Sequence, residues 1–170
     1  MTGRSSGPPD FGRERSTTPD LELRPFRTGP EPLHIRCCTT PDRDGVIALW
    51  ETAFPDDPSH NAPAKVFDAK LAMRDGMLFV ATDAEAAIVG TVMAGYDGHR
   101  GWLYTVAVSP GHRRRGIGTA LVRHAVAALR AEGCGKVNLQ IRSSNRAVRR
   151  FYESLGFRAE ERLSMGMLLR

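Results

Sequence analysis

Arginine and glycine gather in one short stretch of this 170-residue sequence, R-R-R-G-I-G at 113–118. Residues 102–108 before it are β-branched and aromatic, typical of a buried strand, and apolar residues follow at helical spacing over 117–131. Glycine lets a ligand approach the backbone, and the first turn of a helix has N–H groups without intrahelical partners. Together with the arginines, the stretch predicts a site for phosphate or pyrophosphate. The plainer interpretation is a solvated basic turn.

Two common phosphate motifs do not fit this stretch. A Walker loop requires a lysine directly after its second glycine, and no lysine follows Gly116 or Gly118. The dinucleotide fingerprint requires a third glycine where Leu121 stands. Both motifs are therefore set aside.

The stretch resembles the signature of the GNAT superfamily of acyl-CoA-dependent N-acetyltransferases. In that family a strand ending in V-x-P is followed by [QR]-x-x-G-x-[GA] at the start of a helix. V-S-P at 108–110 and R-R-R-G-I-G at 113–118 match this pattern. Downstream, 139–145 and F-Y-E-S-L-G-F at 151–157 resemble the family's second signature. Within the family, the chain is most similar to the bacterial ribosomal-protein alanine N-acetyltransferase group and its uncharacterised neighbours.

The resemblance implies acetyl transfer from acetyl-CoA to a primary amine, by direct attack in a ternary complex. The acceptor would be a protein N-terminus, a lysine or a small-molecule amine. The resemblance implies that Tyr152 is the general acid that protonates the CoA sulfur. The alternative is a tyrosine that only packs in the core. The resemblance also implies that Asn145 contacts the cofactor. The plainer interpretation is a helix N-cap, and the two roles are compatible. The implied cofactor-binding residues are Val106, Ala107, Val108, Arg113, Arg114, Arg115, Gly116, Ile117, Gly118, Thr119, Asn145 and Tyr152.

No carboxylate stands where relatives carry the general base. Gln140 occupies the place of the glutamate in L-E-[VI]-R, and 103–105 reads L-Y-T on the other strand that can supply one. Asp97 and His99 are the candidate end of a water relay, because histidine exchanges protons near neutrality; Glu51 is a further candidate. The missing base keeps open an alternative of another class, a non-catalytic acetyl-CoA-binding sensor module.

The pattern predicts a mixed α/β domain over residues 33–170. Helices are expected at 42–52, 62–74, 117–131 and 145–155, and the strands include 136–142 and 161–169. The family's fold implies a sheet of six to seven strands, splayed between strands 4 and 5 and flanked by about four helices. Residues 1–32 hold six of the eleven prolines, which predicts a disordered Pro/Gly/Arg-rich leader or a misassigned start.

The net charge of +5 is unevenly distributed. Residues 109–170 carry thirteen Lys and Arg against four Glu, or +9, whereas residues 34–108 carry −4. Coenzyme A phosphates account for the arginines near the loop; a nucleic-acid partner, the rival explanation, is disfavoured because aromatics do not alternate with the arginines. Three cysteines form neither a disulfide framework nor a metal pattern, and no apolar run could span a bilayer. We expect a cytoplasmic monomer or homodimer without a metal.

Overall fold

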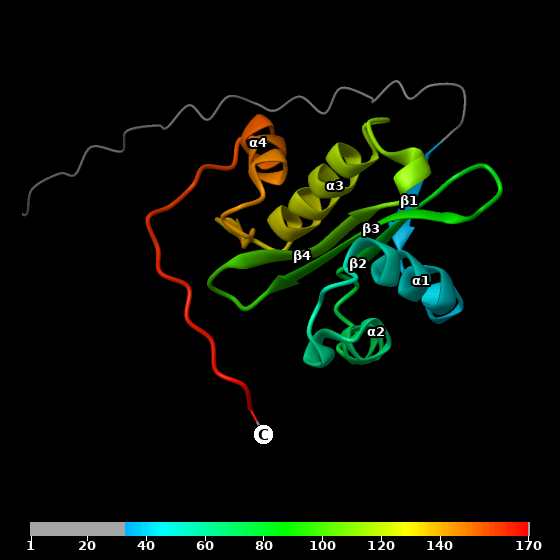
Figure 1. Cartoon of the computed structure of the whole chain (residues 1–170), viewed down its shortest axis with the longest axis horizontal. Helices are drawn as coiled ribbons and strands as arrows, with labels where there is room; N and C mark the ends of the chain where they lie inside the picture. Colours follow the sequence, from blue (N-terminus) through cyan, green and yellow to red (C-terminus); the bar gives the residue numbers. More distant parts are fainter. Residues whose placement is uncertain (1–32, 170) are drawn as a thin grey trace, which may run out of the picture.

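The structure is a computed structural model that describes residues 33–169 (Figure 1). The predicted leader at 1–32 therefore lies outside the described residues. The strands are β1 His34–Cys37, β2 Leu78–Thr82, β3 Ile88–Tyr96, β4 Gly101–Val108 and β5 Val137–Leu139. The helices are α1 Arg43–Ala53, α2 Pro63–Ala72, α3 Ile117–Ala131 and α4 Arg146–Ser154. All four predicted helices are confirmed to within a few residues.

The strands form one mixed sheet in chain order from β1 to β5. The first four are antiparallel neighbours, whereas β5 lies parallel to β4. A parallel pair needs a crossover connection, and α3 supplies it. Helices α3 and α4 lie over one face of the sheet, and α1 and α2 lie over the other (Figure 1).

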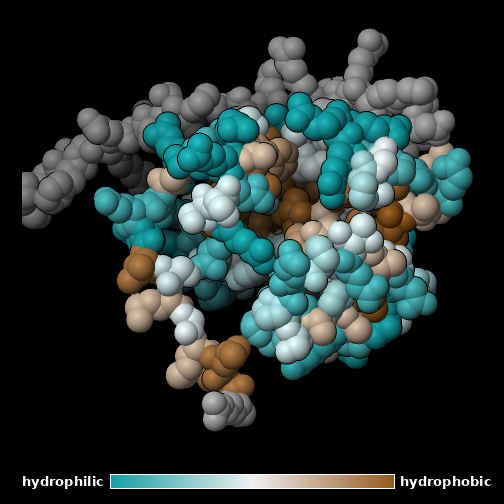
Figure 2. Space-filling model, in the orientation of Figure 1, coloured by the Kyte–Doolittle hydropathy of each residue, from teal (hydrophilic) through white to brown (hydrophobic). Residues whose placement is uncertain are grey.

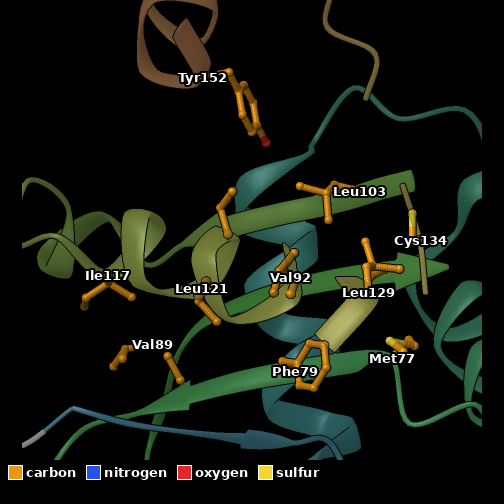
Figure 3. Packing of buried hydrophobic residues seen from close by; sticks show 14 residues of the cluster. Met77, Phe79, Val89, Val92, Leu103, Ile117, Leu121, Leu129, Cys134 and Tyr152 are labelled. Atoms are coloured by element: carbon orange, nitrogen blue, oxygen red, sulfur yellow. The ribbon is translucent and has the colours of Figure 1, made fainter. Parts of the chain in front are cut away.

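An apolar layer covers each face of the sheet, because neighbouring residues in a strand point to opposite sides. Phe79 and Val92 pack with Leu121 of α3 on one face (Figure 3). Val80, the residue after Phe79, packs on the other face in a cluster with Trp50 of α1. Because an apolar layer covers each face of the sheet, the two layers determine where a ligand could reach each strand.

The expected six to seven strands are not confirmed, since the sheet holds five within residues 33–169. The strand predicted at 136–142 is shortened to Val137–Leu139, and residues 161–169 form no ladder. The alternation of Leu163, Met165 and Met167 is a strand pattern, but a strand also needs backbone partners. This tail contacts the region of β5 through side chains, such as Gln140 Nε2 donating to Ser164 Oγ at 2.7 Å.

The apolar side chains of the tail are consequently exposed. Leu163 and Met165 are each 88% exposed. Figure 2 shows apolar side chains along the tail, which extends away from the sheet and its helices.

An ion pair between the partly exposed Arg36 and the buried Asp42 joins β1 to the start of α1. Arg36 donates from Nη1 and Nη2 to the two carboxylate oxygens of Asp42, at 2.6 and 2.7 Å. Thr39 adds its backbone N–H and its hydroxyl to the same carboxylate. The hydrogen bond from Arg36 is the main reason that the pKa of Asp42 falls to about 2, below its usual 3.8.

We predict that Asp42→Asn lowers the free energy of unfolding at pH 7 by about 1–2 kcal/mol. The folded-state pKa is depressed, so the stabilisation is complete above pH 4 and is lost as the pH falls from 4 to 2. Chemical denaturation at pH 7, 4 and 2 should show the difference from wild type shrinking. The control is Asp68→Asn, which breaks the exposed pair with Arg43 and should change stability little. Equal losses at every pH would contradict the prediction.

Candidate active site

The site is the place where β4 and β5 separate. Their ladder joins Gly101–Leu103 to Val137–Leu139, and β4 then continues to Val108 without a β5 partner among the described residues. The pairing of β3 with β4 also shifts register at this point, because Thr91 pairs with Ala107 while Met93 pairs with Tyr104. One residue of β3 therefore opposes two of β4, which is a β-bulge. Bulges bend the strand that carries them.

The bulge includes a residue in an unusual conformation. Thr105 has φ +43°, in the left-handed region that residues with a Cβ rarely adopt. The extra residue also changes which side chains face α3: Leu103 does so before the bulge, and Val106 and Val108 do so after it. The bend and the change of face both fall where the two strands part.

The backbone of Val106 and Val108 faces the opening between the strands. Ser109 N donates to Val89 O at 2.9 Å, so Ser109 faces β3. Backbone groups alternate in direction along an antiparallel strand. Ala107 therefore also faces β3, and Val106 and Val108 face away from it. In agreement, the Val108 carbonyl accepts from Arg113 Nε at 3.2 Å, outside the sheet.

The basic stretch forms the loop that leads from this edge into α3. Gly116 is the N-cap of α3 with φ +82°, and Arg114 has φ +63°. No acidic residue lies in the first turn of α3, and Gly116 has no side chain to cap it. The N–H groups of Ile117, Gly118 and Thr119 thus begin a helix without a side-chain partner in the described chain, next to exposed arginines.

The first turn of α3 lies against α4 and the end of β4. A Cβ placed on Gly118 would lie 3.4 Å from Phe151 Cζ and 3.7 Å from Val108 Cγ2. The Ile117 side chain is buried in the core, so Ile117 offers a ligand only its backbone. The fold therefore brings together the loop, the open edge and the second predicted segment.

Tyr152 of α4 reaches into the same region. Its side chain is 8% exposed and packs edge to face with Phe151 and Phe157, at ring-centroid distances of 5.0 and 5.5 Å. Figure 3 shows the ring extending from α4 toward β4, with the hydroxyl oxygen at the end away from α4. Burial raises the pKa of Tyr152 to about 12. The phenol therefore keeps its proton at neutral pH, as a general acid must.

Asn145 has the expected role of helix N-cap, and its contact with the cofactor stays a prediction. Its Oδ1 accepts the backbone N–H of Val148 at 3.1 Å and so caps α4. The residue is exposed, and its amide nitrogen points to no partner that the described residues supply.

Asp97 and His99 lie in the turn between β3 and β4. The Asp97 carboxylate accepts the N–H groups of Arg100 and His99, at 2.6 and 2.8 Å, and these bonds lower its pKa. The turn precedes Gly101, whereas the basic loop follows Val108 at the other end of β4. At about 3.3 Å per residue, His99 is roughly 20 Å from Val106 along the strand. The structure does not bring these two residues to the loop and Tyr152.

Three residues at the bulge were not singled out from the sequence: Trp50, Thr91 and Thr105. Trp50 and Thr91 are buried, and a hydrogen bond links them. A threonine within the apolar run I-V-G-T-V-M-A at 88–94 was the available signal, since a buried hydroxyl needs a partner.

Asp57 was also missed. It lies 3.7 Å from Arg142 in an ion pair that joins the loop after α1 to the segment after β5. Arg142 follows β5, the strand that pairs with the first part of β4. The position of Asp57 was not readable from a loop sequence.

The geometry suits an acyl-CoA. Exposed strand amides can pair with an extended amide-containing arm, and the helix start with its arginines can bind a diphosphate. The Thr105 hydroxyl is buried at the bulge with no hydrogen-bond partner between residues 33 and 169. An orphaned polar atom at this point is expected where a ligand completes the site.

Comparison with known proteins decides the family. The model of the Acetyltransferase (GNAT) family matches residues 43–157, more than half of the chain. The chain belongs to the GNAT acetyltransferases. Relatives in this family include acetyltransferases of Yersinia enterocolitica and Pectobacterium atrosepticum, each 38% identical over 137 residues. Each alignment covers 81% of this chain and 96% of the relative. The resemblance seen in the motifs is confirmed, and the protein is an acetyl-CoA-dependent acetyltransferase.

Solved GNAT structures share the fold. The ribosomal-protein-S18-alanine N-acetyltransferase from Escherichia coli aligns with a TM-score of 0.64 and 26% identity, over 74% of this chain and 77% of that chain. An aminoglycoside N-acetyltransferase in complex with CoA aligns with a TM-score of 0.67 over 81% of this chain and 95% of that chain. At 18% identity, the second comparison shows the fold alone.

Among residues 33–169, no helix combines the length and apolar character needed to cross a bilayer.

Proposed function

We propose that this GNAT acetyltransferase transfers an acetyl group from acetyl-CoA to a primary amine by direct attack in a ternary complex. The observation that carries the proposal is the open edge of β4 at Val106 and Val108, which lies between the basic loop and Tyr152. This arrangement places donors for a thioester, a diphosphate and a leaving thiolate along one side of α3.

Each chemical requirement has a candidate group. The N–H of Val106 faces the opening and can polarise the thioester carbonyl, while Val108 can pair with the pantetheine arm. Arg113, Arg114 and Arg115, with the amides of residues 116–119, can bind the diphosphate. Tyr152 can give its proton to the CoA sulfur as the carbon–sulfur bond breaks and the carbon–nitrogen bond forms.

The acceptor is a protein N-terminus or lysine, or a small-molecule amine. The E. coli neighbour is named as acting on the alanine of ribosomal protein S18, which supports a protein N-terminus. The −4 charge of residues 34–108 would attract either cationic acceptor. The alternative of a non-catalytic sensor module receives no support, since the relatives are named acetyltransferases.

We predict that acetyl-CoA and CoA each raise the melting temperature by roughly 5–10 °C at 100 times their Kd. Gly116→Glu should abolish both shifts, because it places a carboxylate where the diphosphate binds. The matched control is Gly133→Glu, which introduces the same residue at the same φ of +82° beyond the other end of α3 and should keep both shifts. Stabilisation by a DNA duplex but by neither CoA compound would overturn the proposal.

Tyr152→Phe should lower kcat by about 100-fold or more and leave the KM for acetyl-CoA nearly unchanged, because only the acidic proton is removed. The assay would measure CoA release with N-terminal peptides, polyamines and aminoglycosides as acceptors. An unchanged melting-temperature shift with CoA serves as the control for an intact pocket. Wild-type kcat in the variant would exclude Tyr152 as the acid.

The proposed base is a water relay that ends at His99 or Asp97. The relay must run the length of β4, and the lowered pKa of Asp97 favours His99 as the proton acceptor. We predict that His99→Ala moves the acidic limb of the pH–rate profile, whereas Asp97→Asn mainly loosens the turn that its carboxylate holds. Unmoved profiles in both variants would reject the relay and direct the search to Asp57.

A further inference from the structure

A buried chain of hydrogen bonds leads from α1 to the bulge of β4. Trp50 Nε1 donates to Thr91 Oγ1 at 2.8 Å, and Thr91 Oγ1 donates to the Thr105 carbonyl at 3.2 Å. Trp50 is 1% exposed and Thr91 0% exposed, so water does not compete for the bond between them, and the bond from Thr91 to Thr105 is partly buried. The chain joins three elements, α1, β3 and β4, at the residue of β4 that has positive φ.

The direction of this chain fixes one peptide group. Thr91 lies in β3, so the Thr105 carbonyl that it binds points toward β3. The peptide between Thr105 and Val106 is trans, as are all the peptides in the described residues. In a planar trans peptide, C=O and N–H point in opposite directions. The Val106 N–H must therefore point away from β3, into the opening between β4 and β5.

Without this chain, the bulge would be under-determined. Residues in a bulge lose regular ladder bonds, and a non-glycine residue at positive φ is strained, so such a conformation persists only where its surroundings hold it. The Thr91 hydroxyl supplies the missing donor to the Thr105 carbonyl. Trp50 in turn occupies the acceptor side of that hydroxyl, which directs its hydrogen to Thr105.

We propose that Thr91 and Trp50 are positioning residues that orient the Val106 N–H toward the acetyl carbonyl of bound acetyl-CoA. This inference rests on the proposed function. It adds to that function a specific dependence of thioester recognition on two buried side chains that touch neither substrate. A change in how α1 packs on the sheet would therefore also change the orientation of the Val106 N–H.

The test uses ¹⁵N-labelled full-length protein and compares acetyl-CoA with CoA. In wild type, the Val106 amide proton should shift further with acetyl-CoA than with CoA, because only acetyl-CoA brings a carbonyl acceptor. Thr91→Val keeps the shape of the side chain and removes the hydroxyl, so this difference should be lost. Thr91→Ser restores a hydroxyl and should restore the difference.

Kinetics provide an independent readout with any amine that the wild type acetylates. Thr91→Val should lower kcat by about 10-fold to 100-fold, with the KM for acetyl-CoA within about twofold. Trp50→Phe should reduce kcat by less, since the bond from Thr91 to Thr105 survives. The matched control is Thr82→Val, which removes a buried threonine hydroxyl from β2 of the same sheet and should leave kcat and the Val106 shift unchanged.

The possible outcomes separate the two proposals. A wild-type protein that binds neither acetyl-CoA nor CoA would overturn the proposed function, and this inference with it. A wild-type protein that binds both, with Thr91→Val showing the same amide shifts and kcat, would overturn the positioning role alone. Loss of kcat that Thr91→Ser fails to rescue, or an equal loss in Thr82→Val, would assign the effect to general destabilisation and equally overturn it.

Discussion

Hydrogen bonding between β4 and β5 stops at Leu103, and the site depends on that interruption. A sheet that stayed paired would use the N–H groups of Val106 and Val108 in its own ladder. Because the ladder ends, these groups face an opening, beside the loop that enters α3. Exposed arginines and helix amides lie at one end of this edge, and Tyr152 packs in the core cluster beside it; we propose that together they select an acyl-CoA.

The bulge reconciles this opening with a packed core. Leu103 faces α3, and strict alternation would turn Val106 and Val108 to the opposite face. One extra residue returns both side chains to the α3 core while their backbone groups face outward. Thr105 absorbs the change at positive φ, and Thr91 and Trp50 hold it from the other face. Under the proposed function, core packing and substrate recognition would therefore share the same few residues.

Local sequence was enough to predict the strand at 102–108, the glycine loop and all four helices, because each follows from residue type and spacing. Tyr152 packs in the core cluster that Val106 and Val108 border, while its role as the acid stays a prediction, and Asn145 caps α4 as its position before a helix suggests. The predicted strand at 161–169 failed for a physical reason. The alternation of apolar residues gives this segment one apolar face. A strand also needs a neighbouring backbone, and none pairs with the segment among residues 33–169.

The sequence by itself determined the family and predicted both the basic glycine loop and the role of Tyr152, since each is carried by contiguous residues. Only the tertiary structure decided which groups converge. It placed Asp97 and His99 at the far end of β4, joined Asp57 to Arg142 after β5, and brought Trp50 to Thr91 across forty residues of chain. The reason is that hydrogen bonds between distant segments depend on register and on a one-residue bulge, which local spacing does not specify.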